Sequence, residues 1–199
     1  YCVMGAYLYL IQRNMMYFPT PERNHQQAEA VWLETNQQRL KIWRINHAAP
    51  ALLYFGGNAE SVDYNIADFK KLFSDYSVYL VNYRGYGGSS GTPTESGLIE
   101  DALALYDALS PQHSSVSLIG RSLGSAIALH VAAHREVERL ALITPFDSLK
   151  NVAQSHYPIF PVKWLMKDPY EAIKLADRID QPVLALTAQN DRIIPRKHS

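Results

Sequence analysis

Residues 116–126 read VSLIGRSLGSA, and this stretch decides the fold. Its apolar start predicts a strand at 116–119, and the apolar residues that follow predict a helix at 122–134. Between them stands Gly120-Arg121-Ser122-Leu123-Gly124, a Gly-x-Ser-x-Gly pattern. Small residues at both ends permit a sharp turn that lifts the serine hydroxyl above the sheet edge. The pattern predicts Ser122 as a nucleophile; the alternative is an ordinary turn with a capping serine.

Short apolar runs and helix-like segments alternate on both sides of this stretch. Such alternation indicates right-handed crossovers and an α/β fold with a doubly wound, mostly parallel sheet. Two further runs with partial alternation predict an antiparallel pair at one edge of the sheet. The predicted buried strands are 51–55, 77–81, 140–143 and 183–186, the edge pair is 31–35 and 40–45, and the helices are 61–73, 94–109 and 169–178. The last helix is expected to turn Tyr170, Ile173 and Ala176 inward.

The composition bounds the function. The 199 residues suffice for one domain with a sizeable core. Lys plus Arg number 19 and Asp plus Glu number 19, so no net charge favours nucleic acid as a partner. The single cysteine, Cys2, excludes an internal disulfide and a cysteine-rich metal site. We expect neither a metal nor a cofactor.

The chain begins with an apolar segment. Residues 1–11 are mostly apolar, and Gln12, Arg13 and Asn14 follow them. A run of this length is too short to cross a bilayer, which takes about 20 residues. We interpret residues 1–18 as the remnant of a membrane anchor or signal segment, and an N-terminal helix packed on the domain is the alternative. This predicts a protein associated with a membrane or the cell envelope, and otherwise a cytoplasmic one.

A second glycine-containing turn follows the predicted strand 51–55. Its sequence is Phe55-Gly56-Gly57-Asn58-Ala59, and the two glycines allow the backbone to approach a ligand closely. Backbone amides at such a position can stabilise a developing oxyanion. We therefore expect the amides of Asn58 and Leu123 to form an oxyanion hole, with a plain turn before a helix as the alternative.

An acid and a base should accompany the serine. Asp191 follows the predicted strand 183–186 and would lie at the same sheet edge as Ser122, which makes it the candidate acid. Asp147, after strand 140–143, is a rival but is more typical of a cap or turn residue. Of seven histidines, only His198 follows Asp191, and we interpret it as a surface residue. The base is then expected beyond residue 199.

The glycines Gly85, Gly87, Gly88 and Gly91 follow strand 77–81 but do not indicate a nucleotide site. The dinucleotide pattern fails because Ser90 stands where its third glycine belongs. We expect a tight loop in which Arg84 donates hydrogen bonds to backbone carbonyls.

These motifs together resemble one family. FGGNAES (55–61), NYRGYGGSSGTPTE (82–95), GRSLGSA (120–126), TPFDSL (144–149) and NDRIIPRKHS (190–199) stand in the order and spacing of α/β-hydrolases. They are most similar to the membrane-anchored serine hydrolases related to monoacylglycerol lipases, serine aminopeptidases and protein depalmitoylases. Two positions depart from that pattern, since Gly56 stands where the family often has His and Ala188 where it usually has Gly.

The resemblance implies Ser122 as nucleophile, Asp191 as acid, and Asn58 and Leu123 as oxyanion donors. It also implies a catalytic histidine some tens of residues beyond Ser199, so that the C-terminal part of the fold would be missing. Residues 19–199 would form the hydrolase domain, with 145–167 as a short cap over an acyl pocket. The expected activity is cleavage of a carboxylic ester or thioester. A non-catalytic binding protein of the same shape and a peptidase or amidase are the alternatives.

Overall fold

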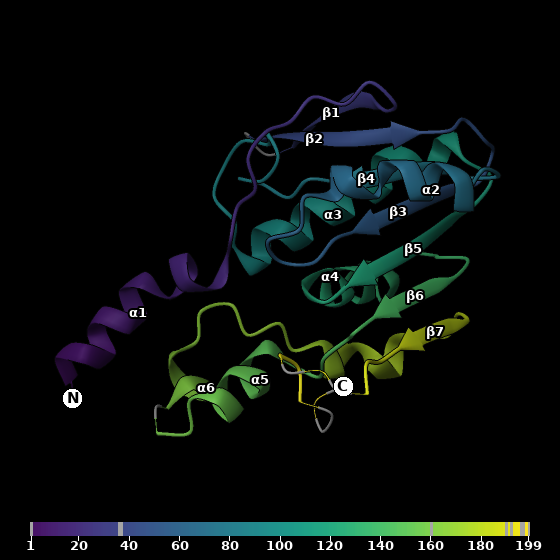
Figure 1. Ribbon diagram of the computed structural model, residues 1–199. Helices are drawn as coiled ribbons and strands as arrows, with labels where there is room; N and C mark the ends of the chain where they lie inside the picture. The colour runs from purple at the N-terminus through teal and green to yellow at the C-terminus, as the bar shows by residue number, and fades with distance from the viewer. Residues whose placement is uncertain are drawn as a thin grey trace.

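A central β-sheet organises the fold (Figure 1). The computed structural model describes residues 2–35, 38–159, 161–189, 191, 193–195 and 198, without the side chains of residues 2, 3, 6 and 163. Within these residues the sheet has seven strands in the order β1-β2-β4-β3-β5-β6-β7. The strands are β1 (Glu29–Thr35), β2 (Gln38–Ile45), β3 (Ala51–Phe55), β4 (Ser77–Val81), β5 (Val116–Arg121), β6 (Leu140–Ile143) and β7 (Val183–Leu186). β1 and β2 pair antiparallel, as does β2 with β4, and all other neighbours are parallel. The predicted α/β sheet and its antiparallel edge pair are therefore confirmed.

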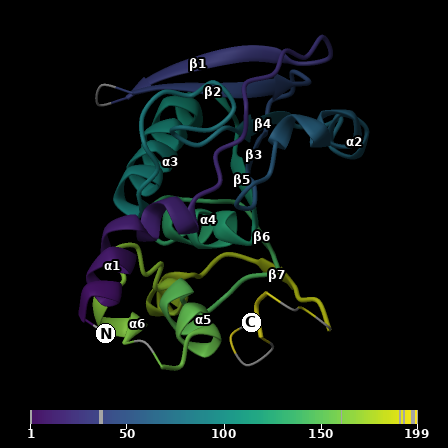
Figure 2. The ribbon, with the colours of Figure 1, turned by 60° about the vertical axis from the view of Figure 1, so that its left-hand side comes forward.

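Helices cover both faces of the sheet (Figure 2), where α3 and α4 lie on one side and α2 on the other. On the first side, Leu98 of α3 and Ile127 of α4 pack in one buried cluster with Leu118 of β5. On the second, Ile66 of α2 packs with Leu80 of β4. The helical segments are α1 (Cys2–Met16), η1 (Val62–Asn65), α2 (Ile66–Leu72), α3 (Glu95–Leu109), η2 (Ser110–Gln112), α4 (Leu123–Ala132), α5 (Leu149–His156), α6 (Val162–Leu165) and η3 (Ala172–Arg178).

The prediction that strand 183–186 is buried is wrong. β7 forms, but all four of its residues are exposed. β7 pairs with β6 along one edge only and is the last strand of the sheet in the described residues. A groove of about 350 Å³ lies beside it on the α2 side of the sheet, lined by residues that include Leu52, Ile119 and Leu184. The apolar run therefore predicts the strand correctly, but it does not predict how much of the strand is buried by other residues.

The helix predicted over 169–178 is shorter and differently wound. η3 is a 3-10 helix at Ala172–Arg178. Tyr170 is buried as expected, but Ile173 and Ala176 are exposed. A 3-10 helix has three residues per turn, so the inward positions are Ala172 and Leu175 instead.

The glycine-rich loop forms between β4 and α3, and its four glycines all have positive φ, from 55° to 96°. The role expected for Arg84 is wrong. Its guanidinium donates to both carboxylate oxygens of Asp101 on α3, each at 2.7 Å, instead of to backbone carbonyls. This pair holds the loop against α3, which begins as predicted after Thr94, whose hydroxyl caps the helix by accepting the N–H of Gly97.

Candidate active site

Ser122 occupies the turn between β5 and α4 in a conformation that side chains rarely adopt. Its φ is 49° and its ψ is −115°. The side chain makes no capping hydrogen bond to α4, which argues against the alternative of a capping serine. The Ser122 N–H instead donates to the carbonyl of Ile143 (2.8 Å), which extends the pairing of β5 with β6. The strained turn is thus fixed by the sheet, and the hydroxyl remains available.

The two glycines of the turn are required by close packing. A Cβ on Gly124 would overlap the carbonyl oxygen of Phe55 and lie 2.7 Å from that of Gly56. A Cβ on Gly120 would lie 2.8 Å from the Cβ of Ala128 in α4. The Gly-x-Ser-x-Gly pattern therefore reflects the fit of the turn between β3 and α4.

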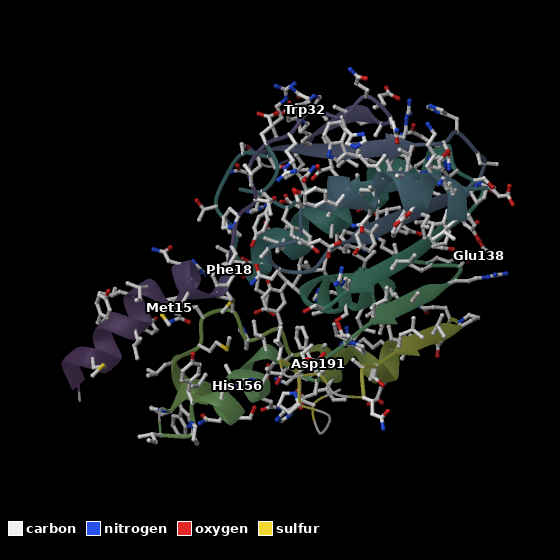
Figure 3. All side chains as sticks on the ribbon, in the orientation of Figure 1. Met15, Phe18, Trp32, Glu138, His156 and Asp191 are labelled. Carbon is white, nitrogen blue, oxygen red and sulfur yellow. The ribbon has the colours of Figure 1, made fainter. Side chains whose placement is uncertain are left out.

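The parallel strands bring the candidate residues to one edge of the sheet. Phe55 pairs with Gly120, Arg121 with Ile143, and Ile143 with Leu186. The segments that follow these strand ends carry Asn58, Ser122, Asp147 and Asp191. Figure 3 shows Asp191 on this side of the sheet and Glu138, which precedes β6, on the opposite side. Ligands of parallel α/β sheets bind at the carboxyl edge.

The turn after β3 lies directly against the serine. A Cβ on Gly57 would be 3.7 Å from Ser122 Cβ. Tyr83 donates to the Gly56 carbonyl (2.7 Å), and Glu60 accepts the Gly57 N–H (2.6 Å). Among the described residues, the backbone N–H groups of Asn58 and Leu123 have no protein acceptor. Both are therefore free to donate to a bound oxyanion.

The Asn58 side chain is fixed by the segment that follows α1. Its Oδ1 accepts the Phe18 N–H (3.1 Å) and the Tyr86 hydroxyl (2.8 Å), and its Nδ2 donates to the Met16 carbonyl. Burial raises the pKa of Tyr86 to about 12, although the hydrogen bond from the Phe18 amide lowers it, so the hydroxyl keeps its proton at neutral pH. The amide side chain thus holds the turn in place, while its backbone N–H remains free.

Asp191 lies in the loop after β7. Its Oδ1 accepts the N–H groups of Ile193 (2.8 Å) and Ile194 (2.9 Å). In the part of the chain that the structure describes, Oδ2 has no partner. Residues 190 and 192 lie outside the described residues. One oxygen therefore fixes the loop, and the other can accept an imidazole N–H.

Asp147 and His198 form a hydrogen-bonded pair that the sequence did not predict. His198 Nδ1 lies 3.0 Å from Asp147 Oδ2, and the Asp147 N–H donates to the His198 carbonyl (2.8 Å). The interpretation of His198 as a surface residue is wrong, since its side chain is only 15% exposed. Burial alone would raise the pKa of Asp147, but hydrogen bonds from Asn151, His198 and Ser148 outweigh it and lower that pKa. Asp147 therefore joins the start of α5 to the loop that carries Asp191.

No histidine in the described residues is hydrogen bonded to Ser122. His156 Nε2 contacts the Ile193 carbonyl (2.9 Å), and His130 stacks on His134 with ring centroids 4.5 Å apart. His113 binds the Tyr79 hydroxyl (2.9 Å). No group of three or more His, Cys, Asp or Glu side chains suited to a metal ion occurs in the described residues.

The α1 helix packs against the segment at 165–170 beside the site. Arg13 pairs with Asp168 (2.7 Å), and Gln12 donates to the Leu165 carbonyl (3.1 Å). Figure 3 places Met15 and Phe18 on the same side of the sheet as His156 and Asp191. None of the described helices is both long and apolar enough for a membrane span. The alternative expected from the sequence, a packed N-terminal helix, matches the contacts at the C-terminal end of α1.

Comparison with curated proteins finds relatives that match most of this chain. The protein MT2364 of Mycobacterium tuberculosis is 34% identical over 206 residues, which cover 96% of this chain and 73% of that protein. The lysophosphatidylserine lipase ABHD12 of Rattus norvegicus is 33% identical over 192 residues, which cover 83% of this chain and 48% of the lipase. The chain thus spans about half the length of ABHD12.

Solved structures of other hydrolases share the fold. The Pyrococcus furiosus esterase Pf2001 superposes with a TM-score of 0.72 at 18% identity, covering 92% of this chain and 81% of the esterase. An alpha-beta hydrolase of Vibrio vulnificus superposes with a TM-score of 0.67 at 21% identity, covering 83% and 65%. A family model of the alpha/beta hydrolase fold matches residues 50–167. This match, the relatives and the serine turn together show that the chain belongs to the α/β-hydrolase family.

Proposed function

We propose that this protein is a serine hydrolase that cleaves a carboxylic ester or thioester of an acyl substrate. The observation that carries the proposal is the conformation of Ser122, held at φ 49° on the sheet edge without a capping hydrogen bond. Such strain persists only where the surrounding structure imposes it, and it is typical of catalytic positions. The membership of a hydrolase family and the lipase and esterase relatives support the same class of reaction.

The proposed reaction follows the residues at the edge. Ser122 Oγ attacks the acyl carbonyl carbon while a histidine takes its proton, and Asp191 orients and stabilises that histidine. The N–H groups of Asn58 and Leu123 donate to the tetrahedral oxyanion. The intermediate then expels the alcohol or thiol, which takes the proton from the imidazolium. Water, activated by the same histidine, releases the acyl group and regenerates Ser122.

Asp191 suits the role of acid better than Asp147. Both oxygens of Asp147 already accept hydrogen bonds, Oδ1 from Ser148 and Oδ2 from Asn151 and His198. Asp191 has one oxygen anchored by backbone amides and the other unpaired within the described residues. An orienting carboxylate needs both a fixed position and a free acceptor. We propose that the histidine lies outside residues 1–199, because no described histidine is hydrogen bonded to Ser122.

The acyl chain is proposed to lie under residues 145–167. This segment contains α5 and α6 and follows β6 directly, so it stands beside the carboxyl edge. Several of its apolar side chains are exposed, among them Tyr157, Ile159 and Trp164. The lysophosphatidylserine lipase ABHD12, a relative, acts on a lipid by its name. A cap with these side chains suits an apolar acyl group.

Membrane association through the N-terminus is a further part of the proposal. On α1, Met4, Tyr7 and Leu10 are exposed. Apolar and aromatic side chains on an exposed helix favour the interface of a bilayer. Co-sedimentation of the full-length protein with phosphatidylcholine vesicles tests this. Removal of the three side chains (Met4→Ser, Tyr7→Ser, Leu10→Ser) should release the protein, whereas unchanged co-sedimentation would refute a role for α1.

A fluorophosphonate probe tests the nucleophile in the full-length protein. We expect the probe to label the wild type and Ser74→Ala but not Ser122→Ala. Ser74, an exposed serine on the segment after α2, serves as the control. Absence of labelling in the wild type, or labelling that survives Ser122→Ala, would refute the proposal. Turnover of p-nitrophenyl esters but not of aminoacyl anilides separates an esterase from a peptidase or amidase of the same fold.

A non-catalytic binding protein is the second candidate. The observation that favours it is that Ser122 has no histidine partner among the described residues. A full-length protein that binds a long-chain ester without hydrolysing it, and that the probe does not label, would support this candidate. Ester turnover that depends on Ser122 would exclude it.

A further inference from the structure

Glu60 holds the turn that follows β3 by three side-chain hydrogen bonds. Its Oε2 accepts the Gly57 N–H (2.6 Å). Its Oε1 accepts the Tyr54 hydroxyl (2.6 Å) and Nδ2 of Asn65 (2.7 Å). These partners lie on β3, the turn and η1, so one carboxylate ties the turn to both elements that flank it.

The backbone of Glu60 adds a fourth hydrogen bond that fixes the direction of the next amide. Its N–H donates to the Gly57 carbonyl (3.2 Å). In a planar trans peptide, the C=O and N–H groups point in opposite directions. Because the Gly57 carbonyl points toward Glu60, the Asn58 N–H of the same peptide points away from it. Glu60 therefore holds the peptide on each side of the Gly57 Cα, the preceding one through the Gly57 N–H and the following one through the Gly57 carbonyl.

The carboxylate also faces the serine turn. Arg121, which precedes Ser122, places Nη1 3.6 Å from Glu60 Oε2. The Glu60 side chain is 13% exposed, whereas that of Arg121 is 53% exposed. A largely buried carboxylate needs several donors to offset its desolvation. Glu60 has donors on β3, the turn after it and η1, and the Arg121 guanidinium of the serine turn lies nearby. Glu60 thus links the turn after β3 to the residue before the nucleophile.

We propose that Glu60 is a positioning residue that aims the Asn58 N–H at the reacting carbonyl oxygen. The inference rests on the proposed function, and it adds a residue that the sequence analysis did not single out. Glu60 does not touch the substrate in this role and acts through the Gly57–Asn58 peptide. Its contribution is therefore expected in the transition state, where the oxyanion forms, and not in the binding of the uncharged ester.

Steady-state hydrolysis of a p-nitrophenyl ester by the full-length protein tests this. We expect Glu60→Ala to lower kcat about 10- to 100-fold with little change in KM, since a misaligned oxyanion donor costs rate and not ground-state binding. Phenylboronic acid, which forms a tetrahedral adduct with a reactive serine, should bind Glu60→Ala more weakly by a similar factor. Glu60→Gln should recover much of kcat, because its amide oxygen can still accept the Gly57 N–H.

Glu138→Gln is the matched control, since it removes a carboxylate from the opposite edge of the sheet (Figure 3). It should keep the wild-type kcat and boronate affinity. A wild type without ester turnover would overturn both the proposed function and this inference. An active wild type would overturn only the inference if Glu60→Ala kept its kcat, if KM rose instead, or if Glu60→Gln were as slow as Glu60→Ala.

Discussion

The hydroxyl groups of Tyr17 and Tyr170 are hydrogen bonded at 2.8 Å in the interior of the protein. The two residues are separated by 153 positions in the sequence, and Tyr170 stands just before η3 with a φ of 40°. Burial raises the pKa of each tyrosine well above its ordinary value, so neither ionises near neutral pH. Together with the Arg13–Asp168 pair, this contact fixes the end of α1 to the segment that follows α6.

Replacing one partner of this pair should destabilise the protein. Tyr17→Phe leaves the Tyr170 hydroxyl buried without this partner, which costs about 1–3 kcal/mol. The urea midpoint, with the slope of the transition unchanged, measures the loss. The double variant Tyr17→Phe/Tyr170→Phe should lose less than the sum of the two single variants, because it leaves no unpaired hydroxyl. Additive losses would show that the two hydroxyl groups are not coupled.

The serine turn should not tolerate a side chain at Gly124. In Gly124→Ala, the new Cβ would overlap the Phe55 carbonyl oxygen, and backbone atoms cannot move aside cheaply. We expect a loss of stability of about 3 kcal/mol or more, near the upper range for overpacked cores, and loss of any activity of Ser122. Thermal unfolding followed by circular dichroism measures the stability.

Gly5→Ala is the control for this substitution. Gly5 lies in α1, and no atom lies within 4 Å of the position that its Cβ would take. Alanine favours a helix over glycine by up to about 1 kcal/mol, so the variant should be as stable as the wild type or slightly more so. A Gly124→Ala protein with the melting temperature of Gly5→Ala would contradict the packing described for the turn.

The Arg84–Asp101 pair should contribute strongly to the loop between β4 and α3. The Asp101 side chain is 6% exposed and that of Arg84 13% exposed, and Asp101 also accepts the Thr35 hydroxyl (2.8 Å). Asp101→Ala would leave the guanidinium buried without its carboxylate, at a cost of about 3–5 kcal/mol. Asp107→Ala removes the exposed pair with Arg135 and should cost less than about 1 kcal/mol. Equal losses in the two variants would refute the distinction.

The sequence predicts the elements whose signal is local. The strand, turn and helix around Ser122 follow from apolar runs and two glycines, and the structure confirms their order and sheet edge. Contacts between distant segments have no such signal. The pairs Asp147–His198 and Arg84–Asp101 depend on which segments meet in space, so the local sequence around His198 or Arg84 does not reveal the partner of either residue. The prediction that β7 is buried is wrong for the same reason, because an apolar run indicates a strand but not which segments cover it.

The stability of the protein should depend on pH through His130. Burial lowers the pKa of this histidine, and the nearby His134 and Arg178 lower it further. Its folded-state pKa therefore lies below the unfolded value of about 6.5. As the pH falls through 6.5, the unfolded chain binds a proton before the folded protein does, so the free energy of unfolding decreases. This contribution is fully present above that pH and is lost toward acid.

Urea unfolding at pH 8 and pH 5.5 measures this dependence. His130→Gln cannot take up the proton, so its free energy of unfolding should fall less between the two pH values than that of the wild type. His47→Gln removes an exposed histidine instead and serves as the control for the loss of one imidazole. If His130→Gln and the wild type lost equal stability over this range, His130 would not be a source of the pH dependence. The stacked pair that it forms with His134 would then have to accept a proton in the folded state as readily as the unfolded chain does.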